Sequence, residues 1–139
     1  MPRDTRTGWV LESMIGPALQ MGGYIVTKQK RIGPRPSGRR HVVDALAEKN
    51  GKQYLISLKW QQVSGTAEQK VPFEVICLIH AMKQTPGEYE KAYLVLGGDG
   101  WSLRDFYISG GLVEYTNHTN YVQIVTLEHF IALANKGAL

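Results

Sequence analysis

The pair Asn50-Gly51 is the feature that most constrains the fold of this chain of 139 residues. It lies between two short apolar stretches rich in β-forming residues, His41–Glu48 and Gln53–Trp60. Asn-Gly between such stretches is the strongest short-range hairpin signal, because both residues tolerate the positive φ angles of a tight turn. The sequence therefore predicts an antiparallel β-hairpin from residue 41 to residue 60.

Further helices and strands are predicted on both sides of the hairpin. Apolar residues three and four positions apart indicate helices, and short runs of β-forming residues between turn residues indicate strands. In chain order the elements are a helix over 8–20 bent by Pro17, a strand over 24–30, the hairpin, a helix from a capping box at Thr66–Gln69 to Gln84, a strand over 91–96, a short helix over 102–109 capped by Ser102, a strand over 121–125 and a C-terminal helix capped by Thr126. This order predicts one α/β domain that spans residues 1–139.

The composition excludes membrane proteins and disulfide-rich domains. Hydrophobic residues make up 43% of the chain and charged residues 20%, and no stretch approaches the roughly 18 apolar residues of a membrane span. Residues 1–8 lack the apolar stretch of a secretory signal, and the one cysteine, Cys77, cannot form an internal disulfide. We therefore expect a cytoplasmic protein with no membrane partner and a buried, unpaired Cys77.

The basic residues are concentrated in the first 40 positions. This segment holds eight basic residues against two acidic ones, a net charge of +6, whereas the other 99 residues carry a net charge of −2. Its last ten residues include two prolines, two glycines and four arginines, which predicts an exposed loop. Such a segment is typical of proteins that bind polyphosphate, although a solvated surface gives the same pattern. The candidate contacts are Lys30, Arg31, Arg35, Arg39 and Arg40.

One acid and one base lie inside the two apolar stretches of the predicted hairpin. Asp44 is in the first stretch and Lys59 is near the end of the second. Burying either charge is costly unless it is paired or serves a site, so a structural salt bridge across the hairpin is one interpretation. The other is metal-assisted phosphodiester hydrolysis, which needs acidic oxygens to hold the ion and a cation that orients water or stabilises developing charge.

The order of these features resembles the PD-(D/E)XK nucleases, which include restriction enzymes, archaeal Holliday-junction resolvases and one class of homing endonuclease. Over residues 8–84 the chain has a helix with Glu12, a basic loop, Asp44, a hairpin turn, and Ser57-Leu58-Lys59 followed by a helix. The resemblance implies a restriction-endonuclease-like αβββαβ core with a mixed central sheet flanked by helices. It also implies that Asp44 and Lys59 belong to a metal site, and that Glu12 matches the helical acid of the resolvase branch.

The chain departs from the family pattern at Ser57, where the family usually has Asp or Glu two residues before the lysine. A hydroxyl is a poor Mg²⁺ ligand compared with a carboxylate. Some restriction enzymes of the family carry this serine and supply the missing acid from the following helix. The resemblance therefore implies Glu74 in that role, with Glu68 as the second choice. The alternative for Glu74 is an exposed ion pair with Lys70, one helical turn earlier.

Three further residues close to Lys59 or Asp44 are candidates for the site. In relatives a glutamine just after the lysine often lines the active site, and Gln61 matches it. Trp60 either stacks on a nucleotide or packs within the sheet. His41 either contacts phosphate or is a solvated side chain at the end of a loop.

The resemblance implies a metal-dependent DNA endonuclease that uses Mg²⁺, with Mn²⁺ as a substitute. The implied substrate is double-stranded or branched DNA, in an intracellular, prokaryotic or phage-like setting. A small domain with one active site cuts both strands as a symmetric assembly, so we expect a homodimer or homotetramer. The alternative function is a catalytically impaired nuclease-fold protein that acts as a DNA-binding or assembly subunit, because its strand acid has become Ser57.

Neutralising Arg35, Arg39 and Arg40 together should weaken binding to all DNA sequences alike, because phosphate contacts carry no sequence information. The slope of log K against log salt should flatten by about 0.9 for each phosphate that the protein no longer neutralises. Binding titrations at several salt concentrations measure this slope. An unchanged slope would show that the loop faces away from DNA.

Overall fold

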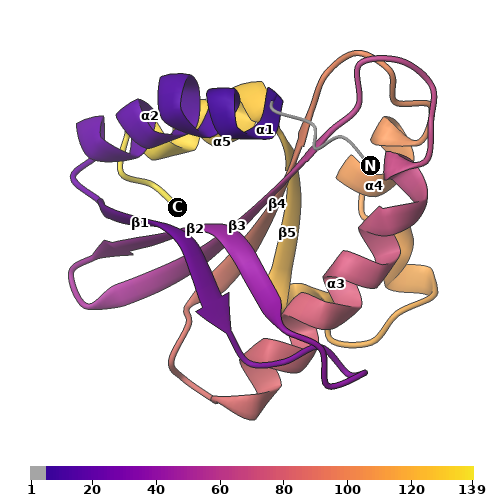
Figure 1. The fold of residues 1–139 in the computed structure, drawn as a ribbon, viewed down its shortest axis with the longest axis horizontal. Helices are drawn as coiled ribbons and strands as arrows, with labels where there is room; N and C mark the ends of the chain where they lie inside the picture. Colours follow the sequence, from indigo (N-terminus) through magenta and orange to yellow (C-terminus); the bar gives the residue numbers. More distant parts are fainter. Residues whose placement is uncertain (1–5) are drawn as a thin grey trace.

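The sheet in the computed structural model, which describes residues 6–139, has five strands whose spatial order is their order in the sequence (Figure 1). β2 is antiparallel to both β1 and β3, whereas β4 is parallel to both β3 and β5. The strands are β1 (Ile25–Ile32), β2 (His41–Lys49), β3 (Lys52–Trp60), β4 (Lys91–Gly97) and β5 (Val122–Thr126). The sheet is therefore mixed, as predicted, with β3 at its centre.

Helices cover both faces of this sheet (Figure 1). The N-terminal helices and α5 lie on one face, and α3 and α4 lie on the other. The helices are α1 (Arg6–Val10), the π-helical turn η1 (Leu11–Ile15), α2 (Gly16–Met21), α3 (Ala67–Gln84), α4 (Arg104–Ile108) and α5 (Leu127–Asn135), with 3₁₀ turns η2 (Gly111–Glu114) and η3 (Thr119–Tyr121). No helix in this described part of the chain is long and apolar enough to cross a membrane. Arg3 of the basic segment lies outside the described residues.

The predicted hairpin is confirmed as β2 and β3. Asn50 and Gly51 form its turn with φ angles of 54° and 77°, and Lys49 pairs with Lys52 at its end. The basic loop that precedes it is shorter than predicted, because Arg31 and Ile32 extend β1 and only residues 33–40 are irregular.

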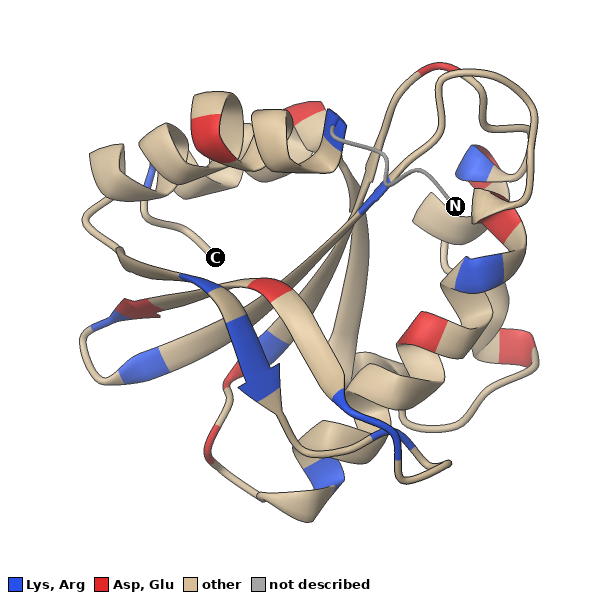
Figure 2. Ribbon diagram, in the orientation of Figure 1, with Lys and Arg blue, Asp and Glu red and all other residues tan. Residues whose placement is uncertain are grey.

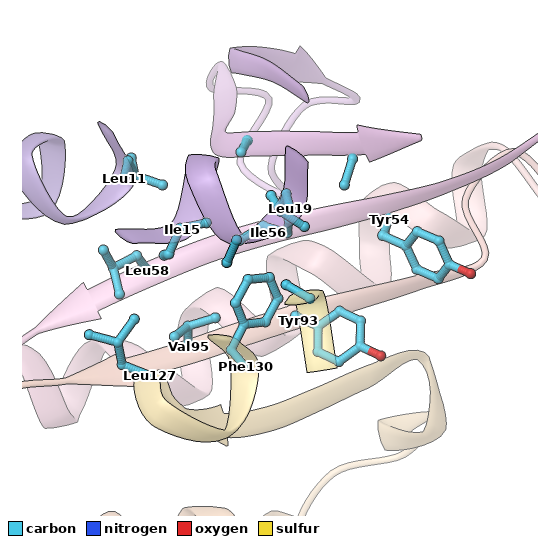
Figure 3. Packing of buried hydrophobic residues seen from close by; sticks show 14 of the residues in the cluster. Leu11, Ile15, Leu19, Tyr54, Ile56, Leu58, Tyr93, Val95, Leu127 and Phe130 are labelled. Atoms are coloured by element: carbon cyan, nitrogen blue, oxygen red, sulfur yellow. The ribbon is translucent and has the colours of Figure 1, made fainter. Parts of the chain in front are cut away.

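The core beneath α1, α2 and α5 is built on alternate residues of the central strands (Figure 3). Ile56 and Leu58 of β3 pack here with Phe130 of α5, and Phe130 makes an edge contact with Tyr93 at 5.6 Å between ring centroids. Because strand residues alternate between faces, Leu55 packs in the other core, against α3. Ser57 therefore faces α3 as well, where it contacts Glu74.

The N-terminal helix differs from the prediction of a single α-helix bent near its end by Pro17. The chain is helical from Arg6 to Met21, but its middle turn, η1, is π-helical. The N–H of Gly16 bonds to the carbonyl of Leu11, five residues back, and the next residue, Pro17, has no N–H to donate. The irregular turn therefore lies just before the proline.

Two of the three predicted helix caps are wrong. The Thr66 side chain makes no capping hydrogen bond to α3; instead Gln61 Oε1 accepts the N–H of Ala67 at 2.9 Å. Ser102 does not cap α4, which begins at Arg104, because its hydroxyl donates to Glu68 at 2.8 Å. The third cap is confirmed, since the Thr126 hydroxyl accepts the N–H of His129.

Replacing Gln61 with Ala should destabilise the fold by about 1–3 kcal/mol, because the N–H of Ala67 and the carbonyl of Gly100 would both be left without their side-chain partner. Thr66→Ala is the matched control and should change stability by less than about 0.5 kcal/mol, because the exposed Thr66 makes no cap. Urea denaturation midpoints measure both. Equal losses of stability in the two variants would contradict this assignment and indicate that Thr66 caps α3.

Candidate active site

A hollow of about 760 Å³ opens where β2 and β3 separate, beside the N-terminal helix and α3. It brings together most of the candidate site residues, although they come from distant parts of the sequence. Those that line it are Glu12, Arg35, Asp44, Ser57, Lys59, Trp60 and Glu74. Lysines and arginines gather nearby on β1 and on the loop that joins it to β2 (Figure 2).

Asp44 lies at the point where the pairing of β2 with β3 ends. The last paired residues before this point are Ala45 and Ile56. Beyond them Asp44 Oδ2 accepts the backbone N–H of Leu58 at 2.6 Å. In a regular antiparallel pair this N–H would donate to a backbone carbonyl instead. Val43 and Ala45 pack in different cores, although strand residues two apart normally share a face. The strand is therefore distorted at Asp44, and its carboxylate is held against β3.

Glu74 of α3 occupies the space in front of Ser57. The Ser57 hydroxyl donates to Glu74 Oε2 at 2.8 Å, and both side chains are buried. The exposed pair of Glu74 with Lys70 is therefore wrong, because only 5% of Glu74 is accessible to solvent.

His41 and Arg35 are further partners of Glu74. His41 is fully buried, and its Nε2 donates to Glu74 Oε2 at 3.2 Å, so the interpretation of a solvated loop-end histidine is wrong. Arg35 Nη1 lies 3.4 Å from Glu74 Oε1. The sequence carries one signal for this burial. His41 is two residues before Val43 on the predicted strand, so the two side chains are expected on the same face of the sheet.

The electrostatic surroundings of Glu74 keep it ionised. Burial alone would raise the pKa of this carboxyl group. The hydrogen bond from His41 and the positive charge of Lys59 outweigh burial, and the pKa falls from 4.5 to about 2. Lys59 is thus close enough to Glu74 to act on its charge, and both line the same hollow.

The two other glutamates considered for the site lie in different surroundings. Glu12 is at the edge of the hollow, with 72% of its side chain exposed and one oxygen 3.9 Å from Lys28 Nζ. Glu68, the second choice for the missing acid, does not line the hollow. Its carboxylate accepts hydrogen bonds from Ser102 and from the N–H of Leu103 and holds the start of α4.

Gln61 and Trp60 follow Lys59 but point to different places. Gln61 is 5% exposed and does not line this hollow, because its amide bonds to Gly100 and Ala67. Trp60 does line it, and the guanidinium of Arg6 lies over its ring at 5.6 Å from the centroid.

The basic candidates divide into two groups. Arg31, Arg39 and Arg40 are exposed and Lys30 is partly exposed, as expected for contacts with an external polyanion. Arg35 is different, because its side chain is 27% exposed and is turned toward Glu74.

The donor set fits a hard divalent cation held by few protein ligands. Among residues 6–139 no group of three His, Cys, Asp or Glu side chains has the arrangement of a metal site. Asp44 and Glu74 provide two carboxylates in one hollow. Hard divalent cations such as Mg²⁺ are commonly bound by one or two carboxylates together with waters and substrate phosphates, so the two side chains have the chemistry that such an ion prefers.

Comparisons with known proteins identify the family and the fold. A family model described as a PD-(D/E)XK nuclease superfamily domain matches residues 3–138. A protein of unknown function, AF1548, has a similar fold with a TM-score of 0.50 and 10% identity; the match covers 83% of this chain and 55% of that one. The small subunit of the heterodimeric restriction endonuclease R.BspD6I gives a TM-score of 0.43 at 16% identity, over 84% of this chain and 61% of that one. The chain thus spans little more than half the length of these proteins. No curated protein matches the sequence.

The lowered pKa of Glu74 has a consequence for stability in the absence of divalent metal. Because the folded-state pKa is below the unfolded one, ionised Glu74 stabilises the fold above about pH 4.5, and this contribution is lost as the pH falls toward 2. At pH 7, Glu74→Gln should therefore be less stable than the parent by about 3 kcal/mol, and the difference should shrink toward pH 2.

Urea unfolding in EDTA across this pH range measures the difference. The control is Glu12→Gln, because Glu12 is mostly exposed and should leave stability close to that of the parent throughout. A Glu74→Gln penalty that does not vary with pH would contradict the electrostatic explanation.

Proposed function

Because the chain belongs to the PD-(D/E)XK nuclease superfamily, we propose that it is a metal-dependent DNA endonuclease that hydrolyses phosphodiester bonds in the hollow between β2, β3 and α3. The observation that carries the proposal is the 2.8 Å contact between Ser57 and Glu74. It brings a carboxylate from α3 to the strand position where the family has its second acid. Asp44 and Lys59 line the same hollow.

Each residue of the site has a defined chemical task in this proposal. Asp44 and Glu74 hold Mg²⁺, or Mn²⁺ in its place. When bound, the ion supplies Lewis-acid polarisation of the phosphate and an activated water. The Lys59 ammonium orients the attacking water or stabilises the negative charge that develops on the phosphorus oxygens. Ser57 and His41 position the Glu74 carboxylate through their hydrogen bonds.

The substrate is double-stranded or branched DNA, and the basic loop holds its backbone. Arg39, Arg40 and Arg31 are exposed and provide phosphate contacts, with Lys30 beside them. One site serves one strand, so cleavage of a duplex requires two copies, as a homodimer or homotetramer. Cytoplasmic function in a prokaryote or phage is consistent with this proposal.

One observation favours a second candidate, a DNA-binding or assembly subunit that has lost catalysis. Glu74 is already neutralised by Arg35 and hydrogen-bonded by His41 and Ser57, so a cation at this carboxylate must compete with protein donors. Such a subunit would bind DNA and would not cut it.

A nicking assay on supercoiled DNA with Mg²⁺ separates the two candidates. Asp44→Asn and Lys59→Ala should each reduce cleavage at least a hundredfold, because both are proposed to act at the reacting phosphate. Folding and DNA binding should remain close to those of the parent. Activity within threefold of the parent in either variant would remove the proposed site, and a parent that binds but never nicks would favour the inactive subunit.

The role of Glu74 is tested by moving the carboxylate. Glu74→Ala alone should be nearly inactive, whereas Ser57→Glu combined with Glu74→Ala should retain or recover cleavage, because the acid returns to the position usual in the family. If Glu74→Ala alone cuts normally, Glu74 is only a structural partner of Arg35 and His41, and Glu12 must complete the site.

A further inference from the structure

A second hollow, of about 390 Å³, lies next to the catalytic one. Trp60 and Ala67 line both, and the remaining walls are Arg6 and the loop Gln61–Thr66. We propose that this second hollow is a subsite for a nucleobase adjacent to the scissile phosphate, and that the loop reads that base. The inference rests on the proposed function, because it requires a DNA phosphate in the first hollow. Trp60 and Ala67 line both hollows, so the second is an adjoining space for a neighbouring nucleotide.

The base of the loop is clamped to the turn that follows β4. The N–H of Gln61 donates to the carbonyl of Gly97 at 3.0 Å, the N–H of Gly100 donates to the carbonyl of Gln61 at 2.8 Å, and the Gln61 amide donates to Gly100. Glycine is required for this approach, because a Cβ on Gly98 would lie 2.4 Å from the Gln61 carbonyl oxygen. A loop fixed in this way loses little conformational entropy when it binds a ligand.

The outer part of the same loop exposes the groups that recognise base edges. Gln62, Ser64 and Thr66 are exposed polar residues, and Val63 between them is 75% exposed. Amide side chains form paired hydrogen bonds with adenine, hydroxyl groups bond to several bases, and apolar groups contact the thymine methyl. The loop is therefore held in place at Gln61, and its exposed residues offer amide, hydroxyl and apolar groups to a ligand.

The part of the second hollow formed by Trp60 and Arg6 is suited to a flat aromatic ligand. Trp60 fits closely against β4, because a Cβ on Gly97 would lie 2.7 Å from its ring. The guanidinium of Arg6 lies over the indole, 5.6 Å from its centroid. Both groups have planar faces on which nucleobases stack, and such stacking tolerates any base. Stacking on this wall and edge recognition by the loop together define a base subsite.

The test measures binding rather than cleavage, with Ca²⁺ in place of Mg²⁺ and a pool of duplex oligonucleotides that contain a randomised segment. The parent should enrich particular bases at one or more positions by at least fivefold. A loop variant, Gln62→Ala with Val63→Ser and Ser64→Ala, should lose that enrichment while its total DNA affinity changes less than about threefold. Since these residues are exposed, the variant is expected to fold. Val113→Ser with Asn117→Ala, two exposed positions outside both hollows, is the matched control and should keep the enrichment of the parent.

A second measurement tests stacking. Removing the base at the enriched position should weaken binding of the parent about tenfold. The same abasic change should have less than a threefold effect on Trp60→Leu or Arg6→Gln; the second variant covers the case in which the Trp60 variant fails to fold.

The inference is overturned if the parent has no base preference, if the loop variant keeps it, or if the abasic penalty is the same in all three proteins. A parent that shows the preference but never nicks DNA would contradict the proposed cleavage and leave the subsite standing.

Discussion

The structure depends on how one buried carboxylate is satisfied. A charged group removed from water is costly unless donors surround it, and Glu74 receives them from Ser57 on β3, His41 on β2 and Arg35 on the basic loop. These contacts connect α3 to β2, to β3 and to the basic loop that precedes β2. The same interactions that allow the charge to be buried also hold the carboxylate at the edge of the hollow, so the stability of the fold and the geometry of the site have a common origin.

The separation of β2 from β3 is the second condition for the site. A continuous ladder would use the N–H of Leu58 in the sheet and leave no space between the strands. Because pairing ends at Ala45 and Ile56, Asp44 takes that N–H with its side chain, and a hollow opens beside it. The neighbouring strand β1 is distorted at the position opposite Asp44, where Gln29 has a φ of 53°. Regular pairing of β2 with β3 is therefore absent at Asp44, the position that contributes an acidic side chain to the hollow.

Local patterns in the sequence were sufficient for the order of elements, for the hairpin at Asn50-Gly51 and for the positions of Asp44 and Lys59 on its two strands. They failed where distant segments meet. The resemblance pointed to Glu74 for the missing acid, but helical spacing alone left an exposed ion pair with Lys70 as the alternative. The basic loop and β2 cover that face of α3 and bury Glu74. Thr66 is of a residue type and at a position typical of a helix cap, yet the side chain of Gln61 accepts the N–H of Ala67 at the start of α3. Neither interaction has a signal in the residues around it.

The candidate site combines residues that are close in the sequence with one that is distant. Asp44, Ser57 and Lys59 come from the two strands of one hairpin, and closing such a short loop of chain costs little entropy. Glu74 reaches Ser57 only when α3 packs against β3, and the parallel pairing of β3 with β4 closes a longer loop of chain. The second carboxylate therefore depends on the tertiary packing of α3. Any local unfolding that separates α3 from the sheet would remove Glu74 from the site while the hairpin residues stay on their strands.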